Sequence, residues 1–167
     1  MNFLPKDKSI AQRCAVLDLD FEQSHIGEDV KSTIKAVETF KQNPEKAKLD
    51  MGNSGTGIRL LSGYIAGSGK NCTLFGDDSL SRRPMSRISD PLNSWGADIS
   101  LKDNKFPPIE IRGSKLKKEF TYDLKIPSAQ IKSCLLLAAL ASKTKITIFE
   151  NIPSRDHTER MLKECGA

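Results

Sequence analysis

The sequence predicts an α+β domain made of repeated units, and two observations lead to this fold class. Residues 74–85 and 148–157 follow one pattern, in which a strand-like run ends in a polar turn with an arginine and a helix follows. Along the chain, the predicted elements also run strand, helix, strand, helix and two strands, after which the order begins again. Because each such element buries one apolar face, we expect the helices to cover the sheets of one domain over residues 1–167.

Helices are expected where apolar residues recur at helical spacing or where small and aliphatic residues cluster. They cover residues 9–17, 28–40, 58–66, 84–95, 128–142 and 158–165. Ser9, Thr56 and Ser128 are the simplest N-caps, since a serine or threonine oxygen accepts a backbone N–H at a helix start. Gly67 and Gly69 are expected to end the third helix.

Strands are expected where apolar and other residues alternate, as on a sheet with one buried face. They cover residues 71–75, 98–101, 109–112, 120–126 and 145–149. The polar segment 42–48 contains a proline and predicts a turn. Residues 52–57 form a loop whose glycines allow either a close approach to a ligand or a positive φ. Residues 1–8 are expected to be an extended strand or a linker, and a weaker copy of the repeat is expected at 24–40.

The chain is basic, and its composition narrows the classes of partner. Its 167 residues carry a formal net charge of +5 with a pI near 9.0, which suits nucleic acid, a membrane surface or small anionic substrates. Aromatic residues make up only 6% and are not interleaved with the basic ones, so stacking on bases is not expected. No apolar run reaches the length of a membrane span. We therefore expect neither nucleic acid nor a membrane as a partner.

The four cysteines are far apart and form no CxxC pair, and the two histidines add no clustered ligand set. This pattern argues against a zinc site, and we expect no metal. Scattered cysteines in a sequence without a signal-peptide pattern are typical of reduced thiols in a cytoplasmic protein. The glycine-rich loop has neither the Walker A nor the GxGxxG spacing, so a nucleotide site is not predicted.

Three predicted helix starts are suited to binding anions, because unpaired N–H groups and the helix dipole attract negative charge there. They are Lys8-Ser9, the 52–57 loop and Ser128-Ala129-Gln130. N-capping alone accounts for any one of these starts taken singly. The set as a whole favours anion binding, because arginines lie near predicted helix starts along the whole chain. These are Arg13, Arg59, Arg83 and Arg155.

Five sequence blocks resemble, in order, the signatures of the 5-enolpyruvylshikimate-3-phosphate synthase family. They are Lys8-Ser9-Ile10 with Arg13, then 49–56 (LDMGNSGT), 82–85 (RRPM), 128–133 (SAQIKS) and 154–159 (SRDHTE). The resemblance implies that family's fold, which has two similar domains, each of three βαβαββ units. Because it covers only the first half of the family's length, it implies one domain of the pair, with an incomplete last unit.

The resemblance also implies an activity, the transfer of an enolpyruvyl group from phosphoenolpyruvate to shikimate 3-phosphate in aromatic amino acid biosynthesis, without a cofactor. The residues expected to hold the phosphate of shikimate 3-phosphate are Ser128, Ala129, Gln130, Ser154 and Arg155. Those expected on its hydroxyl and carboxylate side are Ser9 and Arg13. Those expected to hold phosphoenolpyruvate are Asn53, Gly55 and Arg83. Lys8 is the expected catalytic residue, placed between both ligands to assist proton movement.

In that family, a carboxylate pair and further basic residues come from the second domain. The lysine ammonium and arginine guanidinium groups implied for this chain can bind anions, but they cannot act as a general base. We therefore expect the chain to need the second domain, in cis or in trans, for turnover.

Three other functions stay open at this point. A stand-alone module that binds shikimate 3-phosphate without catalysis would show useful affinity without any partner. An RNA-binding α+β module would fit the positive charge, although interleaved aromatic residues are lacking. A related enolpyruvyl transferase that acts on a UDP-sugar is the third alternative, and the 154–159 block argues against it.

Overall fold

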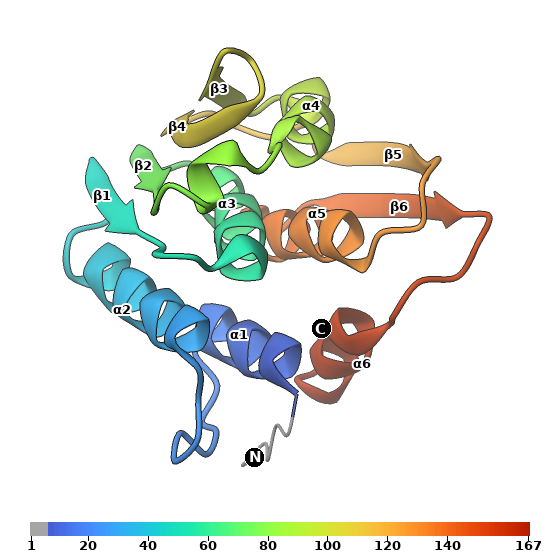
Figure 1. The fold of residues 1–167 in the computed structure, drawn as a ribbon. Coiled ribbons are helices and arrows are strands. Elements are labelled where there is room, and N and C mark those ends of the chain that lie inside the picture. Colours follow the sequence, from blue (N-terminus) through green and yellow to red (C-terminus); the bar gives the residue numbers. More distant parts are fainter. Residues whose placement is uncertain (1–6) are drawn as a thin grey trace.

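The structure is a computed structural model that describes residues 7–167, with four strands in one sheet and two in another (Figure 1). The first sheet has the order β1-β2-β4-β3, formed by β1 (Ala47–Asp50), β2 (Cys72–Phe75), β3 (Asp98–Lys102) and β4 (Phe106–Arg112). β1 and β2 are parallel, whereas β4 is antiparallel to both β2 and β3. The second sheet pairs β5 (Glu119–Leu124) in parallel with β6 (Lys145–Glu150).

Within the described range, six α-helices and one short 3-10 turn surround the strands. They are α1 (Lys8–Leu17), α2 (Glu28–Gln42), α3 (Gly55–Ser68), η1 (Leu80–Arg82), α4 (Ser86–Trp95), α5 (Ala129–Ser142) and α6 (His157–Glu164). α3 and α5 lie side by side at the centre, with the α1–α2 pair below them (Figure 1). None of the helices in residues 7–167 combines the length and apolar composition needed to cross a membrane.

The expected repeat is visible in the order of the elements. β1, α3, β2, α4, β3 and β4 form one complete βαβαββ unit, and β5, α5, β6 and α6 repeat its first four elements. The segments 74–85 and 148–157 are equivalent, since each leads from the second strand of a unit towards its second helix. The α+β fold class is therefore confirmed. Within residues 7–167, the second unit has two strands where the first has four.

The core lies between α3, α5 and the sheets and is mostly aliphatic, as the low aromatic content predicts. α3 and α5 come close together because α3 has glycines where the two helices meet. A Cβ on Gly63 would lie 2.1 Å from the carbonyl oxygen of Cys134, and one on Gly67 would lie 2.2 Å from that of Ala138. A side chain at either position would force the helices apart, so these glycines fix the spacing of the two equivalent helices.

Two local predictions in the first half of the chain are wrong at their boundaries. The turn expected at 42–48 ends early, because Ala47 begins β1 and pairs in parallel with Cys72 of β2. The third helix begins at Gly55 rather than at residue 58, so half of the glycine-rich segment is helical. The extended segment expected at the N-terminus lies largely outside the described residues.

Candidate anion-binding site

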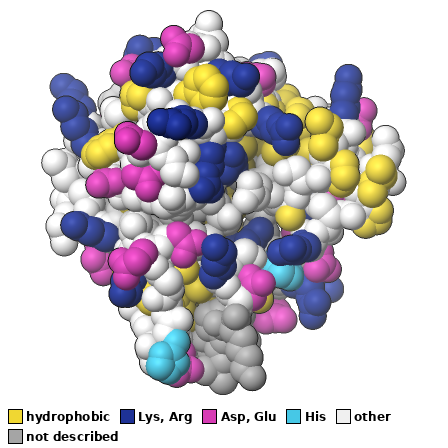
Figure 2. Space-filling model, in the orientation of Figure 1, with side chains coloured by type: hydrophobic (Ala, Val, Ile, Leu, Met, Phe, Trp, Pro, Cys, Tyr) yellow, Lys and Arg dark blue, Asp and Glu magenta, His cyan; other side chains and the backbone are white. Residues whose placement is uncertain are grey.

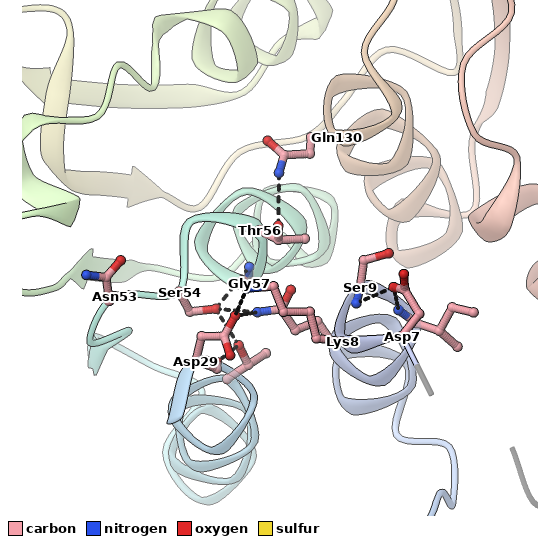
Figure 3. A network of polar contacts seen from close by, with 12 residues as sticks. Asp7, Lys8, Ser9, Asp29, Asn53, Ser54, Thr56, Gly57 and Gln130 are labelled. Carbon is pink, nitrogen blue, oxygen red and sulfur yellow. Dashed lines mark hydrogen bonds and ion pairs between the residues drawn. The ribbon is translucent and has the colours of Figure 1, made fainter. Parts of the chain in front are cut away.

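The first turns of α1, α3 and α5 converge on one cavity of about 350 Å³. The residues that line it are Asp7, Lys8, Ser9, Arg13, Thr56, Ser128, Ala129, Gln130 and Arg155. All of them except Asp7 and Thr56 are predicted site residues. The Gln130 side-chain amide donates to the Thr56 hydroxyl at 2.9 Å and so joins α5 to α3 at the cavity (Figure 3). The cavity therefore brings three helix starts together with three cationic side chains, an arrangement suited to a phosphate.

Lys8 begins α1 and its ammonium group is paired with a carboxylate of α2 (Figure 3). Lys8 Nζ lies 3.2 Å from Asp29 Oδ2, and the lysine side chain is 73% exposed. Gln12, one turn further along α1, is buried and donates from Nε2 to Ser54 Oγ at 2.7 Å and to Asp29 Oδ2 at 3.5 Å. Asp29 thus links Lys8 to the start of α3. Sequence reasoning missed Asp29 and Gln12 as site residues, and an acidic residue at a helix start was the only signal.

Asp7, rather than Ser9, caps α1. Asp7 Oδ1 accepts the N–H groups of Ser9 at 2.7 Å and Ile10 at 3.3 Å. The predicted Ser9 cap is wrong because the helix already begins at Lys8, one residue before it. The Ser9 side chain and, after it, the N–H groups of Ser9 and Ile10 hold the pKa of the Asp7 carboxyl below its usual value. The Ser9 hydroxyl is therefore not used for capping, and Ser9 lines the cavity.

Arg13 borders the cavity but is only 2% exposed. Its guanidinium group donates to Thr158 Oγ1 at 2.6 Å, to Ser133 Oγ at 2.9 Å and to the carbonyl oxygen of Ser9 at 2.7 Å. Burial lowers the pKa of this group. Arg13 thus fixes α1 against α5 and α6, a second task beside any contact with a ligand.

A second group of predicted residues lies at the start of α3, outside the lining of the cavity. Arg83 Nη2 donates to Asn53 Oδ1 at 2.6 Å, and Arg59 Nη1 donates to the carbonyl oxygen of Gly55 at 2.6 Å. Burial lowers the pKa of Arg59, and the nearby charge of Arg83 lowers it further. Figure 2 shows Lys and Arg side chains spread over one face of the molecule, with Asp and Glu side chains between them. Like charges this close favour an anion between or above them.

The serine and glycines before α3 have separate structural roles. Ser54 caps the helix, since its Oγ accepts the Gly57 N–H at 3.2 Å (Figure 3). The predicted Thr56 cap is therefore wrong, because Thr56 already lies within the helix. Gly52 has a positive φ of 51°, which favours glycine there. Gly55 is not among the positive-φ residues.

Of the two serines predicted to bind the phosphate, Ser128 lines the cavity and Ser154 does not. Ser128 lines it and caps α5, as predicted, with its Oγ accepting the Ile131 N–H at 3.4 Å. Ser154 is not part of the lining, and its N–H donates to Glu150 Oε1 at 2.9 Å. Its hydroxyl is buried and has no hydrogen-bond partner among residues 7–167. Desolvation acts to raise the pKa of the Glu150 carboxyl, but the Lys132 ammonium group and the Ser154 side chain and N–H together hold this pKa below its usual value.

Residues 7–167 contain no group of three His, Cys, Asp or Glu side chains arranged to hold a metal ion. Cys14, Cys72 and Cys134 are buried free thiols, and Cys165 is an exposed one. Burial raises the pKa of Cys134 to about 12, so this thiol stays protonated at neutral pH. The side chains that line the cavity supply ammonium, guanidinium, hydroxyl and amide groups and the Asp7 carboxylate.

Comparison with known proteins agrees with this geometry. The family model of EPSP synthase (3-phosphoshikimate 1-carboxyvinyltransferase) matches residues 9–167. The chain belongs to this family. The 3-phosphoshikimate 1-carboxyvinyltransferase of Solibacter usitatus is 41% identical over 189 residues, covering 98% of this chain and 44% of the relative. That of Coxiella burnetii is 55% identical over 125 residues, covering 75% of this chain and 28% of the relative.

Solved structures lead to the same family. The EPSP synthase of Acinetobacter baumannii superposes with a TM-score of 0.82 at 35% identity, over 98% of this chain and 43% of that chain. The chain thus spans less than half the length of the family members it matches. The resemblance found in the sequence is confirmed.

Proposed function

We propose that this chain is one domain of a 3-phosphoshikimate 1-carboxyvinyltransferase, which binds shikimate 3-phosphate and contributes to the phosphoenolpyruvate site. The observation that carries the proposal is the convergence of three helix starts with Lys8, Arg13 and Arg155 on one cavity. The positive ends of helix dipoles and cationic side chains both favour a phosphate, and this cavity has both. Membership of the family supports shikimate 3-phosphate as the anion.

The phosphate of shikimate 3-phosphate is assigned to the space between the start of α5 and the loop before α6. The groups proposed to hold it are Ser128, Ala129, Gln130, Ser154 and Arg155. Ser154 does not line the cavity, so its assignment rests on the resemblance of the 154–159 block to the family. Ser9 and Arg13 are assigned to the hydroxyl and carboxylate side of the ligand. The Arg13 guanidinium group donates hydrogen bonds to Thr158, Ser133 and Ser9. These bonds fix its position, so it would meet the ligand without first being ordered.

Phosphoenolpyruvate is assigned to the start of α3. Asn53, Gly55 and Arg83 are the residues proposed to hold it, with the glycine backbone close to the ligand and the arginine charge beside it. The pair of nearby guanidinium groups, Arg59 and Arg83, supports an anion at this place. Lys8 extends towards this region from α1, which would place its ammonium group between the two ligands (Figure 3).

The proposed reaction is an addition followed by an elimination. The 5-hydroxyl oxygen of shikimate 3-phosphate bonds to C2 of phosphoenolpyruvate while the hydroxyl loses its proton and C3 gains one, giving a tetrahedral intermediate. Loss of a proton from C3 and of phosphate from C2 then restores the enol double bond. Lys8 is the proposed proton carrier, held by Asp29. The general base is assigned to the second domain of the enzyme, in cis or in trans.

Two other readings remain as outcomes to be measured. A stand-alone module would also bind shikimate 3-phosphate at the same cavity. It would differ in giving no phosphate release when the chain is fused to a second domain. An RNA-binding module would use the positive charge of the chain, yet the aromatic residues that stack on bases are few. The cytoplasmic location expected from the sequence stays a prediction.

Calorimetric titration of the chain with shikimate 3-phosphate tests the proposal. We expect saturable binding of one equivalent, with shikimate binding far more weakly because it lacks the phosphate. Equal affinities for the two compounds, or no binding by the folded chain, would contradict the assignment. A titration with a single-stranded RNA oligonucleotide in the same buffer examines the nucleic-acid alternative, and we expect it to bind more weakly than shikimate 3-phosphate.

A further inference from the structure

Lys132 is a buried ammonium group held between two carboxylates from different elements. It lies one helical turn after the cap Ser128, is 6% exposed, and places Nζ 2.7 Å from Glu150 Oε2 and 2.7 Å from Glu159 Oε1. Glu150 is the last residue of β6, and Glu159 lies in the first turn of α6. One side chain thus joins the three elements around the proposed phosphate site.

Glu150 uses its second carboxylate oxygen for the loop between β6 and α6. Its Oε1 accepts the N–H of Ser154 at 2.9 Å. Ser154 and Arg155 are the residues of that loop proposed to contact the phosphate, and Glu159 lies at the far end of the loop. The loop is therefore fixed at both ends by carboxylates that share one ammonium group.

A second set of hydrogen bonds runs beside the first. Thr158, next to Glu159, donates to the hydroxyl of Ser133, next to Lys132, at 2.7 Å. Arg13 donates to both hydroxyls. Successive residues of α5 therefore face successive residues of α6, and a slip of one residue would leave the buried charges and hydroxyls without partners.

The cluster of Lys132 and its two partners does not attract an anion by its own charge. Lys132 carries one positive charge, whereas the partly exposed Glu150 and Glu159 carry two negative charges. A buried ion pair also adds little stability over apolar residues of the same volume, because desolvation offsets the attraction. We therefore expect the main contribution of Lys132 to be the fixed geometry of the loop between β6 and α6.

We infer that Lys132 is a positioning residue, which sets the place of the Ser154–Arg155 loop against α5 and thereby the affinity for a ligand phosphate. The inference rests on the proposed function, since it needs the phosphate at that loop. Lys132 acts through Glu150 and is not part of the cavity lining. A change at Lys132 should therefore weaken the binding of shikimate 3-phosphate more than the binding of shikimate, which lacks the phosphate.

The test compares the affinities of Lys132→Met and wild-type protein for shikimate 3-phosphate and for shikimate. The dissociation constant for shikimate divided by that for shikimate 3-phosphate measures the contribution of the phosphate to affinity. A loss of folded protein lowers the number of sites but leaves this ratio unchanged. We expect the ratio to fall by about 10- to 100-fold, the loss of one or two charge-assisted hydrogen bonds. Lys145→Met is the matched control, since Lys145 makes an exposed pair with Glu119 at 3.5 Å on the same sheet. Its ratio should equal that of wild type.

A second variant guards against a failure to fold, because removing Lys132 leaves two partly buried carboxylates facing each other. Glu150→Gln keeps the volume and an oxygen for the Ser154 N–H while it removes one ionic contact. We expect a smaller fall in the ratio. Amide hydrogen exchange of residues 151–156 without ligand should be faster in Lys132→Met than in wild type and unchanged in Lys145→Met.

Two results would overturn the inference: an unchanged ratio in folded Lys132→Met and Glu150→Gln, or an unchanged exchange rate of the loop in Lys132→Met. Failure of the proposed function looks different, because wild-type protein would then bind neither compound. In that case the exchange rates alone decide whether Lys132 positions the loop.

Discussion

Gly55 and Arg83 are so close that a methyl group on the glycine would displace the guanidinium group. A Cβ added to Gly55 would lie 2.6 Å from Arg83 Nη1 and 3.3 Å from Arg59 Nη1. Since Gly55 does not have a positive φ, the alternative that it serves a strained backbone is wrong. The absence of a side chain at position 55 leaves room for the guanidinium groups of Arg83 and Arg59.

Gly55→Ala should therefore impair the use of phosphoenolpyruvate more than that of shikimate 3-phosphate. The methyl group moves the flexible end of Arg83 away from the proposed ligand, which removes a charge-assisted contact and raises the Michaelis constant for phosphoenolpyruvate by about tenfold or more. The measurement uses this chain fused to the remaining half of the Solibacter usitatus relative. Both Michaelis constants and the melting temperature are determined on the same variant.

Gly57→Ala is the matched control for that experiment. Its Cβ would lie 2.1 Å from Thr33 Oγ1 and 2.4 Å from Ser54 Oγ, inside the packed start of α3. We expect a large drop in melting temperature there and little change for Gly55→Ala. A large drop for Gly55→Ala with an unchanged constant for phosphoenolpyruvate would contradict the ligand assignment.

Arg155→Ala should weaken the binding of shikimate 3-phosphate by about 10- to 100-fold, because one charge-assisted contact to the phosphate is lost. Calorimetry on the variant and on wild type measures the change. Arg160→Ala, an exposed position on α6, removes the same charge outside the cavity and should have little effect. Equal losses in the two variants would mean that general attraction, rather than a contact by Arg155, governs binding.

Lys8→Met should lower kcat of the fused enzyme by about 100- to 10,000-fold, the range for removing a general acid–base group. The affinity for shikimate 3-phosphate should change much less. Lys31→Met serves as the control, since Lys31 makes an exposed pair with Glu28 on α2. A kcat close to wild type in Lys8→Met would remove Lys8 from the proton pathway.

Asp7→Ala should destabilise the chain by about 0.5–2 kcal/mol at neutral pH, because the cap of α1 is lost. The pKa of Asp7 is lower in the folded state than its ordinary value of 3.8. Its contribution is therefore fully present above about pH 5 and is lost as the pH falls through the folded pKa. Denaturant unfolding of both proteins at several pH values should show the difference shrinking below pH 3.8. A difference that stays constant down to low pH would rule out the carboxylate as the cap.

Local signals were sufficient for part of this molecule. The start of α5 was predicted together with its cap, because Ser128 and the apolar run behind it are neighbours in the sequence. The repeated pattern predicted the equivalence of the two units for the same reason. The blocks that resemble the family's signatures are also local, which is why the cavity residues could be proposed before the fold was known.

Other features depend on contacts between distant residues. β1 has only four residues and is fixed by parallel pairing with β2, a partner that the polar segment before it does not reveal. The hydrogen bond of Arg13 to Thr158 joins residues far apart in the sequence, so the engagement of this arginine could not be predicted. The same is true of the pair between Lys8 and Asp29.

The most direct measurement of the central claim is phosphate release from shikimate 3-phosphate and phosphoenolpyruvate, with the chain alone and with the chain fused to the remaining half of the Solibacter usitatus relative. We predict release by the fusion that depends on both substrates, and little or none by the chain alone, because the general base is assigned to the other domain. Release by the chain alone at the rate of the full-length relative would contradict this account. A folded fusion that binds neither substrate would contradict it equally.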